Sequence, residues 1–202
     1  MLDNKVRTWI DPVIDKIALK LARAGISANS ITIFGFITGT AAALEIAFEN
    51  YYFGIVLILI SRLADGLDGA VARVNEKTDL GGFLDITLDF FFYGMIPLAF
   101  MFANPAANAL AGGTLIFTFY ATGASFLAFA LMAEKRGIND DARGSKSLVY
   151  TTGLAEATET IIVFIAFCLF PQWFPEIAYG FAALCLITVT ARIWLAVQTF
   201  TD

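Results

Sequence analysis

Two neighbouring apolar stretches carry four aspartates at helical spacing. Asp65 and Asp68 are three residues apart, and Asp85 and Asp89 are four apart, so each pair shares a face if its stretch is helical. Charged side chains inside membrane-type apolar stretches are unfavourable and point to function. A rise of about 1.5 Å per residue places Asp68 opposite Asp85 and Asp65 opposite Asp89 in antiparallel helices. We therefore predict four carboxylates that converge near one membrane boundary.

This arrangement indicates a metal site. Four bare carboxylates would repel one another, and divalent cations remove that repulsion. Oxygen ligands at this density suit Mg²⁺ or Mn²⁺, and two such ions can clamp a phosphate between them. A structural polar network would not explain the regular spacing. We predict a two-metal site for phosphoryl chemistry whose metal ligands are Asp65, Asp68, Asp85 and Asp89.

The composition narrows the alternatives. The chain has 202 residues and no histidine, which excludes Ser-His-Asp catalysis, His-ligated zinc and histidine proton relays. Hydrophobic residues make up 58% and charged residues 15%, whereas soluble domains contain about 25% charged residues. Cys168 and Cys185 lie in apolar runs without zinc spacing, so we expect both to be buried and structural. The sequence contains no patch of basic and aromatic residues of the kind that binds nucleic acids.

Six apolar runs must position the acids. They span about 31–48, 52–74, 81–103, 112–133, 154–170 and 177–199, and the side chains of Ser27–Ser30 offer an N-cap for the first. Residues 1–25 show apolar residues at i, i+3, i+4 spacing with basic residues between them, which is typical of an interfacial helix; packing on protein is the alternative. The predicted fold class is an all-α integral membrane protein with six transmembrane helices preceded by an N-terminal amphipathic interfacial helix. It forms one domain over 1–202, with the helix over 1–25 and the six-helix bundle over 28–199.

The positive residues give an orientation. Eleven of the 13 Lys and Arg residues lie in the amphipathic segment or in the second–third and fourth–fifth connections. This pattern predicts a multi-pass protein of the cell inner (cytoplasmic) membrane, surrounded by membrane lipids, with both termini cytoplasmic. Gly35 and Gly39 form a small-xxx-small motif that favours a homodimer. Glu45 and Arg62 also lie within apolar runs, and the sequence leaves open whether they pair with each other or take part in catalysis.

The acid cluster resembles the signature of the CDP-alcohol phosphotransferase family, D-x2-D-G-x2-A-R-x8-G-x3-D-x3-D. Eight residues match in type and order: Asp65, Asp68, Gly69, Ala72, Arg73, Gly81, Asp85 and Asp89. The spacing differs from the signature in one place: seven residues rather than eight separate Arg73 from Gly81. The stretch Ser27–Thr32 also resembles a Thr-Pro-Asn-x-x-Thr-like family element, without its proline.

The resemblance implies a reaction. A CDP-linked alcohol, usually CDP-diacylglycerol, donates its phosphoalcohol group to an acceptor hydroxyl and CMP leaves. Matching positions imply that Asp65, Asp68 and Asp85 bind metal, and that Asp89 helps bind the second metal and acts as the general base. Nucleotide binding is implied for Asp65, Asp68, Gly69, Ala72 and Arg73. The cofactors would be Mg²⁺ or Mn²⁺ in a two-metal site.

The acceptor is less defined by the sequence. We expect a polar alcohol, with a glycerol phosphate-type molecule slightly favoured over inositol phosphate, serine or a lipid headgroup. Candidate acceptor-binding residues precede or lie on the last two runs: Lys146, Ser147, Tyr150, Glu156, Glu159 and Arg192. Two alternatives remain: a CDP-aminoalcohol phosphotransferase with a lipid acceptor, and a cation transporter.

Overall fold

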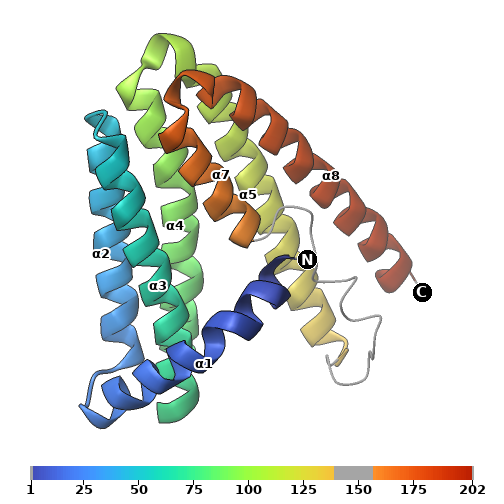
Figure 1. The fold of residues 1–202 in the computed structure, drawn as a ribbon. Coiled ribbons are helices and arrows are strands. Elements are labelled where there is room, and N and C mark those ends of the chain that lie inside the picture. The colour runs from blue at the N-terminus through green and yellow to red at the C-terminus, as the bar shows by residue number, and fades with distance from the viewer. Residues whose placement is uncertain (1, 139–156, 202) are drawn as a thin grey trace.

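The computed structural model describes residues 2–138 and 157–201, in which all regular secondary structure is helical and no strand occurs. Figure 1 shows the helices as long rods that run alternately up and down. Their bounds are α1 Leu2–Arg23, α2 Ala28–Ala47, α3 Tyr51–Asn75, α4 Asp79–Ala103, α5 Pro105–Lys135, α7 Ala157–Leu169, the 3₁₀ turn η3 Pro171–Trp173 and α8 Phe174–Phe200. The predicted all-α fold is confirmed.

Local signals define the helix ends beside the acid cluster. Ser27 caps α2 as the sequence predicts, because its hydroxyl accepts a hydrogen bond from the Ser30 N–H. Thr78 caps α4 in the same way through the Gly81 N–H. Helices α3 and α4 extend further into the α3–α4 connection than expected, which leaves only residues 76–78 of this connection outside helix. The shortened signature therefore corresponds to a tight turn, in which Glu76 has a positive φ of 75°.

Helix α2 packs against both α3 and α4, the two helices that carry the acid cluster. Close approach is possible because Gly35 and Gly39 of α2 are buried against these neighbours. A Cβ added at Gly39 would lie 2.7 Å from the Phe92 ring and 3.0 Å from the Ser61 hydroxyl. The glycines of this motif therefore pack within the chain and give no support for a homodimer, which stays a prediction.

Aromatic side chains fill the core between the other helices. Phe100 of α4 stacks on Phe174 with ring centroids 4.8 Å apart, and Phe164 of α7 packs edge-on against Phe92. Cys168 and Cys185 are free thiols in this core, which confirms their predicted burial. Rigid packing of this kind holds the upper part of the bundle as one body.

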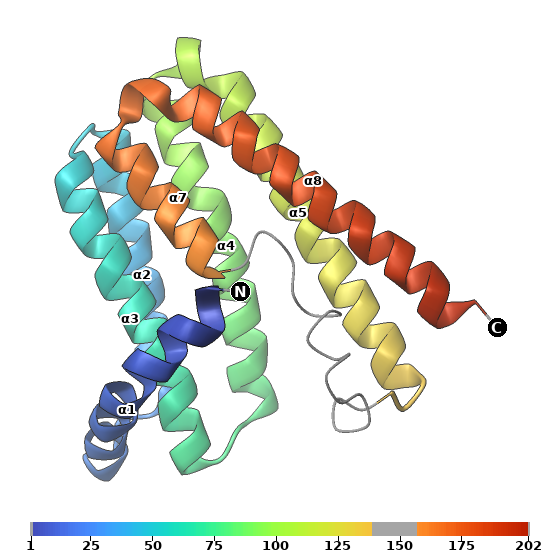
Figure 2. The same ribbon diagram turned by 45° about the vertical axis from the view of Figure 1, so that its right-hand side comes forward.

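Helices α5 and α8 run alongside each other and lean away from α2–α4 toward their lower ends (Figures 1 and 2). Helix α1 crosses near the lower end of α3. Ile14 and Ala18 of α1 are buried in a cluster with Ala64 and Val71 of α3, whereas Val13 is exposed. Helix α1 thus packs on the bundle and still shows apolar surface.

Four of the described helical segments are long and apolar enough to cross a membrane: α2, α4, α5 and the combined η3–α8 segment over Pro171–Phe200. Helix α3 spans 25 residues but carries the charged residues of the signature. The described part of α7 has 13 residues. The described residues thus contain four helices that meet the length and hydropathy of a membrane span, where the sequence predicted six.

Candidate active site

Three carboxylates meet where α3 and α4 face each other. Asp65, Asp68 and Asp85 each offer one oxygen, and these oxygens all lie within 4.8 Å of one another. The i, i+3 spacing on α3 puts the first two on one face, and the antiparallel α4 brings the third to them. A polar cavity of about 10 Å³ adjoins the three side chains and Asp89. This group contains three of the four carboxylates that the helical spacing was expected to bring together, and Asp89 lines the same cavity.

The donor set fits a divalent metal. Asp68 is 4% exposed, and its Oδ2 atom is buried without a hydrogen-bond partner. An unsatisfied buried carboxylate oxygen is unfavourable unless something binds it. Carboxylate oxygens are the ligands that Mg²⁺ and Mn²⁺ prefer. The three carboxylates therefore have the chemistry of a divalent-metal site, and the buried Oδ2 atom of Asp68 lacks a hydrogen-bond partner that a metal could replace.

Asp89 has a partner that the sequence argument left out. Its Oδ1 atom accepts a hydrogen bond from Arg62 Nη1 at 2.8 Å, and the same nitrogen lies 3.6 Å from Asp65 Oδ1. Arg62 therefore bridges the two aspartates that were expected to face each other. The pairing of Arg62 with Glu45 is wrong, because Glu45 instead accepts a hydrogen bond from Asn50 near the other end of α2.

Sequence reasoning left Arg62 off the site, although a signal was present. Arg62 precedes Asp65 by three residues and so shares its helical face. The spacing along α3 did not predict that Arg62 would contact Asp89, which lies on α4, 27 residues further along the chain.

A larger cavity opens beside the acids. It has a volume of about 710 Å³ and is lined by residues of the α1–α2 connection, α2, α3, the α3–α4 turn and α4. Asp68 and Asp85 line both cavities, so the acids stand where the two meet. Gly69, Ala72 and Arg73, the expected nucleotide residues, line the larger one. A Cβ at Gly69 would have only the Arg73 guanidinium nearby, at 3.8 Å, so this wall is open to a ligand.

Arg73 is half-exposed at the edge of this cavity. Its Nη2 lies 3.4 Å from Asp15 Oδ1 of α1, in an exposed ion pair. Exposed pairs of this kind contribute little to stability, so the guanidinium remains available for an anionic ligand.

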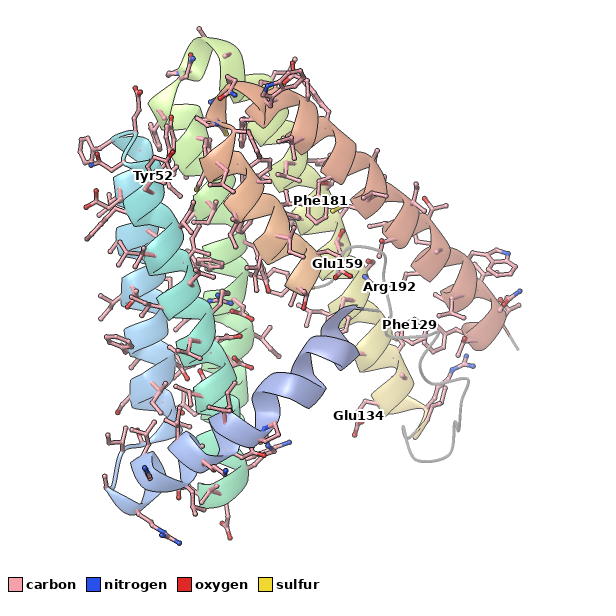
Figure 3. The ribbon with its side chains drawn as sticks, viewed as in Figure 1. Tyr52, Phe129, Glu134, Glu159, Phe181 and Arg192 are labelled. Carbon is pink, nitrogen blue, oxygen red and sulfur yellow. The ribbon has the colours of Figure 1, made fainter. Side chains whose placement is uncertain are left out.

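The expected acceptor residues fall into two groups. Lys146, Ser147, Tyr150 and Glu156 lie outside the described residues. Arg192 of α8 is half-buried and donates hydrogen bonds to the Thr122 carbonyl and to the Ser125 hydroxyl of α5, both at 2.8 Å. Figure 3 shows Glu159 near the lower end of α7, at about the level of Arg192 on α8. The Glu159 Oε2 atom is buried without a hydrogen-bond partner.

The fold and this site define a class of membrane enzyme. Residues 25–199 match the model of the CDP-alcohol phosphatidyltransferase family, and the chain belongs to that family. The protein is therefore a CDP-alcohol phosphotransferase of phospholipid biosynthesis, and the transporter alternative is not supported.

Two relatives cover nearly the whole chain. The inner membrane protein YnjF of Escherichia coli is 47% identical over 194 residues, which are 96% of this chain and 94% of that protein. Archaetidylinositol phosphate synthase of Methanothermobacter thermautotrophicus is 34% identical over 194 residues, with 93% and 88% covered.

A solved structure shares the fold. Phosphatidylinositol phosphate synthase of Mycobacterium tuberculosis with CDP-DAG bound superposes with a TM-score of 0.65 at 21% identity, covering 90% of this chain and 92% of that one. Another structure of that enzyme, in complex with manganese and citrate, has a TM-score of 0.65 at 22% identity, with 89% and 87% covered.

Proposed function

We propose that the protein transfers the phosphatidyl group of CDP-diacylglycerol to the hydroxyl of a polar acceptor and releases CMP. The observation that carries this proposal is the position of Asp65, Asp68 and Asp85, which meet beside a cavity of about 710 Å³ that Arg73 lines. A cluster of hard anionic ligands next to a cationic side chain suits a metal-bound pyrophosphate. The related solved enzyme with CDP-DAG bound supports the same donor.

Each residue has a role that follows from its place. Arg73 lies at the cavity edge and would pair with the pyrophosphate, because a guanidinium binds phosphate oxygens in a bidentate manner. Gly69 and Ala72 leave space for the nucleotide along α3. Asp89 would accept the proton of the acceptor hydroxyl while that oxygen forms a bond to the lipid-bearing phosphorus. The bond from this phosphorus to the bridging oxygen then breaks, and the bridging oxygen leaves with CMP.

We assign the metal ligands to Asp65, Asp68 and Asp85, with Asp89 completing a second site. Bound Mg²⁺ or Mn²⁺ would neutralise pyrophosphate charge and lower the pKa of a coordinated hydroxyl. The unpartnered Asp68 oxygen and the manganese in the related structure support this assignment. The carboxylates then need only to orient the reacting groups, which suffices for in-line phosphoryl transfer.

We propose a phosphorylated polyol as the acceptor. Arg192 of α8 supplies a half-buried guanidinium, and Glu159 of α7 supplies a buried, unpartnered carboxylate oxygen. A cation for the phosphate and an anion for the hydroxyls suit such a molecule. The sequence slightly favours glycerol phosphate, whereas the archaeal relative is named for an inositol phosphate product, so both are tested.

The membrane arrangement is part of the proposal. We infer six spans, α2 to α8, within one domain over 1–202, with α1 at the interface and both termini cytoplasmic. The α1–α2 connection and the α3–α4 turn lie at the lower ends of the helices in Figure 1, and both line the larger cavity. A lipid donor could then enter from the bilayer and a polar acceptor from the cytoplasm. A homodimer would have to use a surface other than the Gly35–Gly39 motif.

The test is an acceptor panel. Purified protein is incubated with CDP-diacylglycerol, Mn²⁺ or Mg²⁺, and glycerol phosphate, inositol phosphate, serine or buffer, and CMP and lipid products are read by mass spectrometry. A second arm offers CDP-choline or CDP-ethanolamine with diacylglycerol. We expect metal-dependent CMP release with one phosphorylated polyol. Turnover confined to the second arm would overturn the donor assignment.

A further inference from the structure

We propose that Arg62 is a positioning residue of this enzyme, an internal cation that holds Asp89 and Asp65 in place inside the acid cluster. The inference rests on the proposed role of Asp89 as the general base. Neither the signature nor the sequence argument includes Arg62, because it lies one helical turn before the first aspartate of the motif.

Three contacts fix the Arg62 guanidinium. Nη1 donates to Asp89 Oδ1 at 2.8 Å, and Nη2 donates to the Ser61 hydroxyl at 3.3 Å. The guanidinium carbon lies 4.0 Å from the centre of the Phe92 ring. An arginine can make these contacts together because its planar fork separates the donors and its flat face stacks on an aromatic ring.

Two residues that contact the Arg62 guanidinium, Ser61 and Phe92, are themselves fixed by burial or hydrogen bonding. The Ser61 hydroxyl donates to the Gly35 carbonyl of α2 at 2.7 Å, and both Ser61 and Phe92 are buried. The Arg62 side chain is 10% exposed. A guanidinium held between α3 and α4 at this depth has few other rotamers open to it. Because Arg62 is held in place, its hydrogen bond also restricts the position of the Asp89 carboxylate.

The consequence falls on Asp89 more than on the other acids. Asp65, Asp68 and Asp85 form the group with metal-ligand spacing, whereas Asp89 is bound by Arg62. The contact occupies Oδ1 of Asp89, so the proposal assigns the acceptor proton to Oδ2. Arg62 also places a positive charge 3.6 Å from Asp65, where it opposes the binding of a cation. Arg62 thus favours catalysis at Asp89 at the expense of metal affinity.

This trade-off predicts a signature that a purely structural arginine would not give. In Arg62→Gln, kcat should fall by about 10- to 100-fold, the usual range for losing a hydrogen bond to a charged group. The KM for CDP-diacylglycerol should change by less than about threefold, because the cavity wall is untouched. Affinity for Mn²⁺ alone should rise by at least about threefold, since a nearby positive charge is removed.

Arg62→Lys separates charge from geometry. It keeps the positive charge, so Mn²⁺ affinity should remain at the wild-type value. A single ammonium group cannot hold Asp89 and Ser61 in the same fork, so kcat should lie between those of the wild type and Arg62→Gln. Arg136→Gln, at the lower end of α5 and outside the site, is the matched control for loss of an arginine.

The experiment uses full-length protein in detergent, with Mn²⁺ binding measured by electron paramagnetic resonance without lipid substrate, and kcat and KM measured by CMP release. Lower kcat with tighter Mn²⁺ binding in Arg62→Gln, partly restored by Lys, supports the proposal. Wild-type kcat, weaker Mn²⁺ binding, or equal loss in the Lys and Gln variants overturns it.

Two further outcomes are also decisive. If Arg62→Gln does not fold, Arg62→Lys alone decides: a kcat below that of the wild type with unchanged Mn²⁺ affinity supports the positioning role, and wild-type kcat or altered affinity overturns it. Absence of CMP release by the wild type would reject the proposed function instead, and the Mn²⁺ comparison would still test the charge of Arg62.

Discussion

Replacing Asp68 by asparagine should have opposite effects on the metal-free and metal-bound protein. Asp68 is buried, its carboxylate lies within 4.8 Å of two others, and its Oδ2 has no hydrogen-bond partner. Without metal, Asp68→Asn removes repulsion and should stabilise the fold. With Mn²⁺ present, the variant loses a ligand and should lose the stabilisation that the metal provides.

The magnitudes follow from the geometry. Two unit charges 4.8 Å apart repel by about 3.5 kcal/mol at an effective dielectric constant of about 20. Asp85 is exposed and Asp65 half-exposed, so solvent screens most of this, and we expect a gain of about 1 kcal/mol, or about 2–4 °C in Tm. Mn²⁺ at about 100 times its Kd should stabilise the wild type by about 2.7 kcal/mol, or about 5–11 °C. In the variant this shift should fall below about 2 °C.

The assay is thermal unfolding in detergent, followed by intrinsic fluorescence, with and without Mn²⁺. Glu134→Gln is the matched control, because this exposed carboxylate lies at the lower end of α5 (Figure 3) and its loss should leave the Mn²⁺ shift intact. A full Mn²⁺ shift in Asp68→Asn would refute the ligand assignment. A lower metal-free Tm would show that the carboxylate stabilises the fold, contrary to the repulsion argument.

Other predictions test the base, the packing and the acceptor. Asp89→Asn should lower kcat by about 10²- to 10⁴-fold with little change in the KM for CDP-diacylglycerol, and near-normal turnover would sink the base assignment. Gly39→Ala should destabilise the protein by about 1–3 kcal/mol, because its Cβ would meet Phe92, whereas Gly113→Ala, with no atom within 4 Å, should be neutral or stabilising by up to about 1 kcal/mol; thermal unfolding distinguishes them. Arg192→Gln should raise the KM for a phosphorylated acceptor by about tenfold and leave the KM for CDP-diacylglycerol unchanged; steady-state kinetics showing the reverse pattern would remove Arg192 from the acceptor site.

Periodicity predicted much of this site because helices translate spacing directly into direction. The i, i+3 step between Asp65 and Asp68 and the i, i+4 step between Asp85 and Asp89 determine which face each pair occupies, whatever surrounds them. The cap at Ser27 is equally local, since its hydroxyl bonds a backbone group three residues away. Helix ends in the α3–α4 turn were predicted less well, because fraying and capping decide them residue by residue.

The small-residue motif shows where such reasoning ends. Gly35 and Gly39 indicate a close helix contact, but a sequence pattern does not say whether the partner helix belongs to the same chain. The structure places Ser61 and Phe92 against them. The same contact supports Arg62, so the motif contributes to the site through packing.

The sequence by itself determined the class of chemistry. Aspartates that share helical faces, the absence of histidine and the apolar stretches together indicate metal-assisted phosphoryl transfer at a membrane surface. Only the tertiary structure decided how the charges are shared. Asp65, Asp68 and Asp85 form one group, and Arg62 bridges Asp89 to Asp65 of that group. The reason is physical: spacing sets direction around one helix axis, whereas the partner of a charge depends on the rotation and depth at which two helices pack.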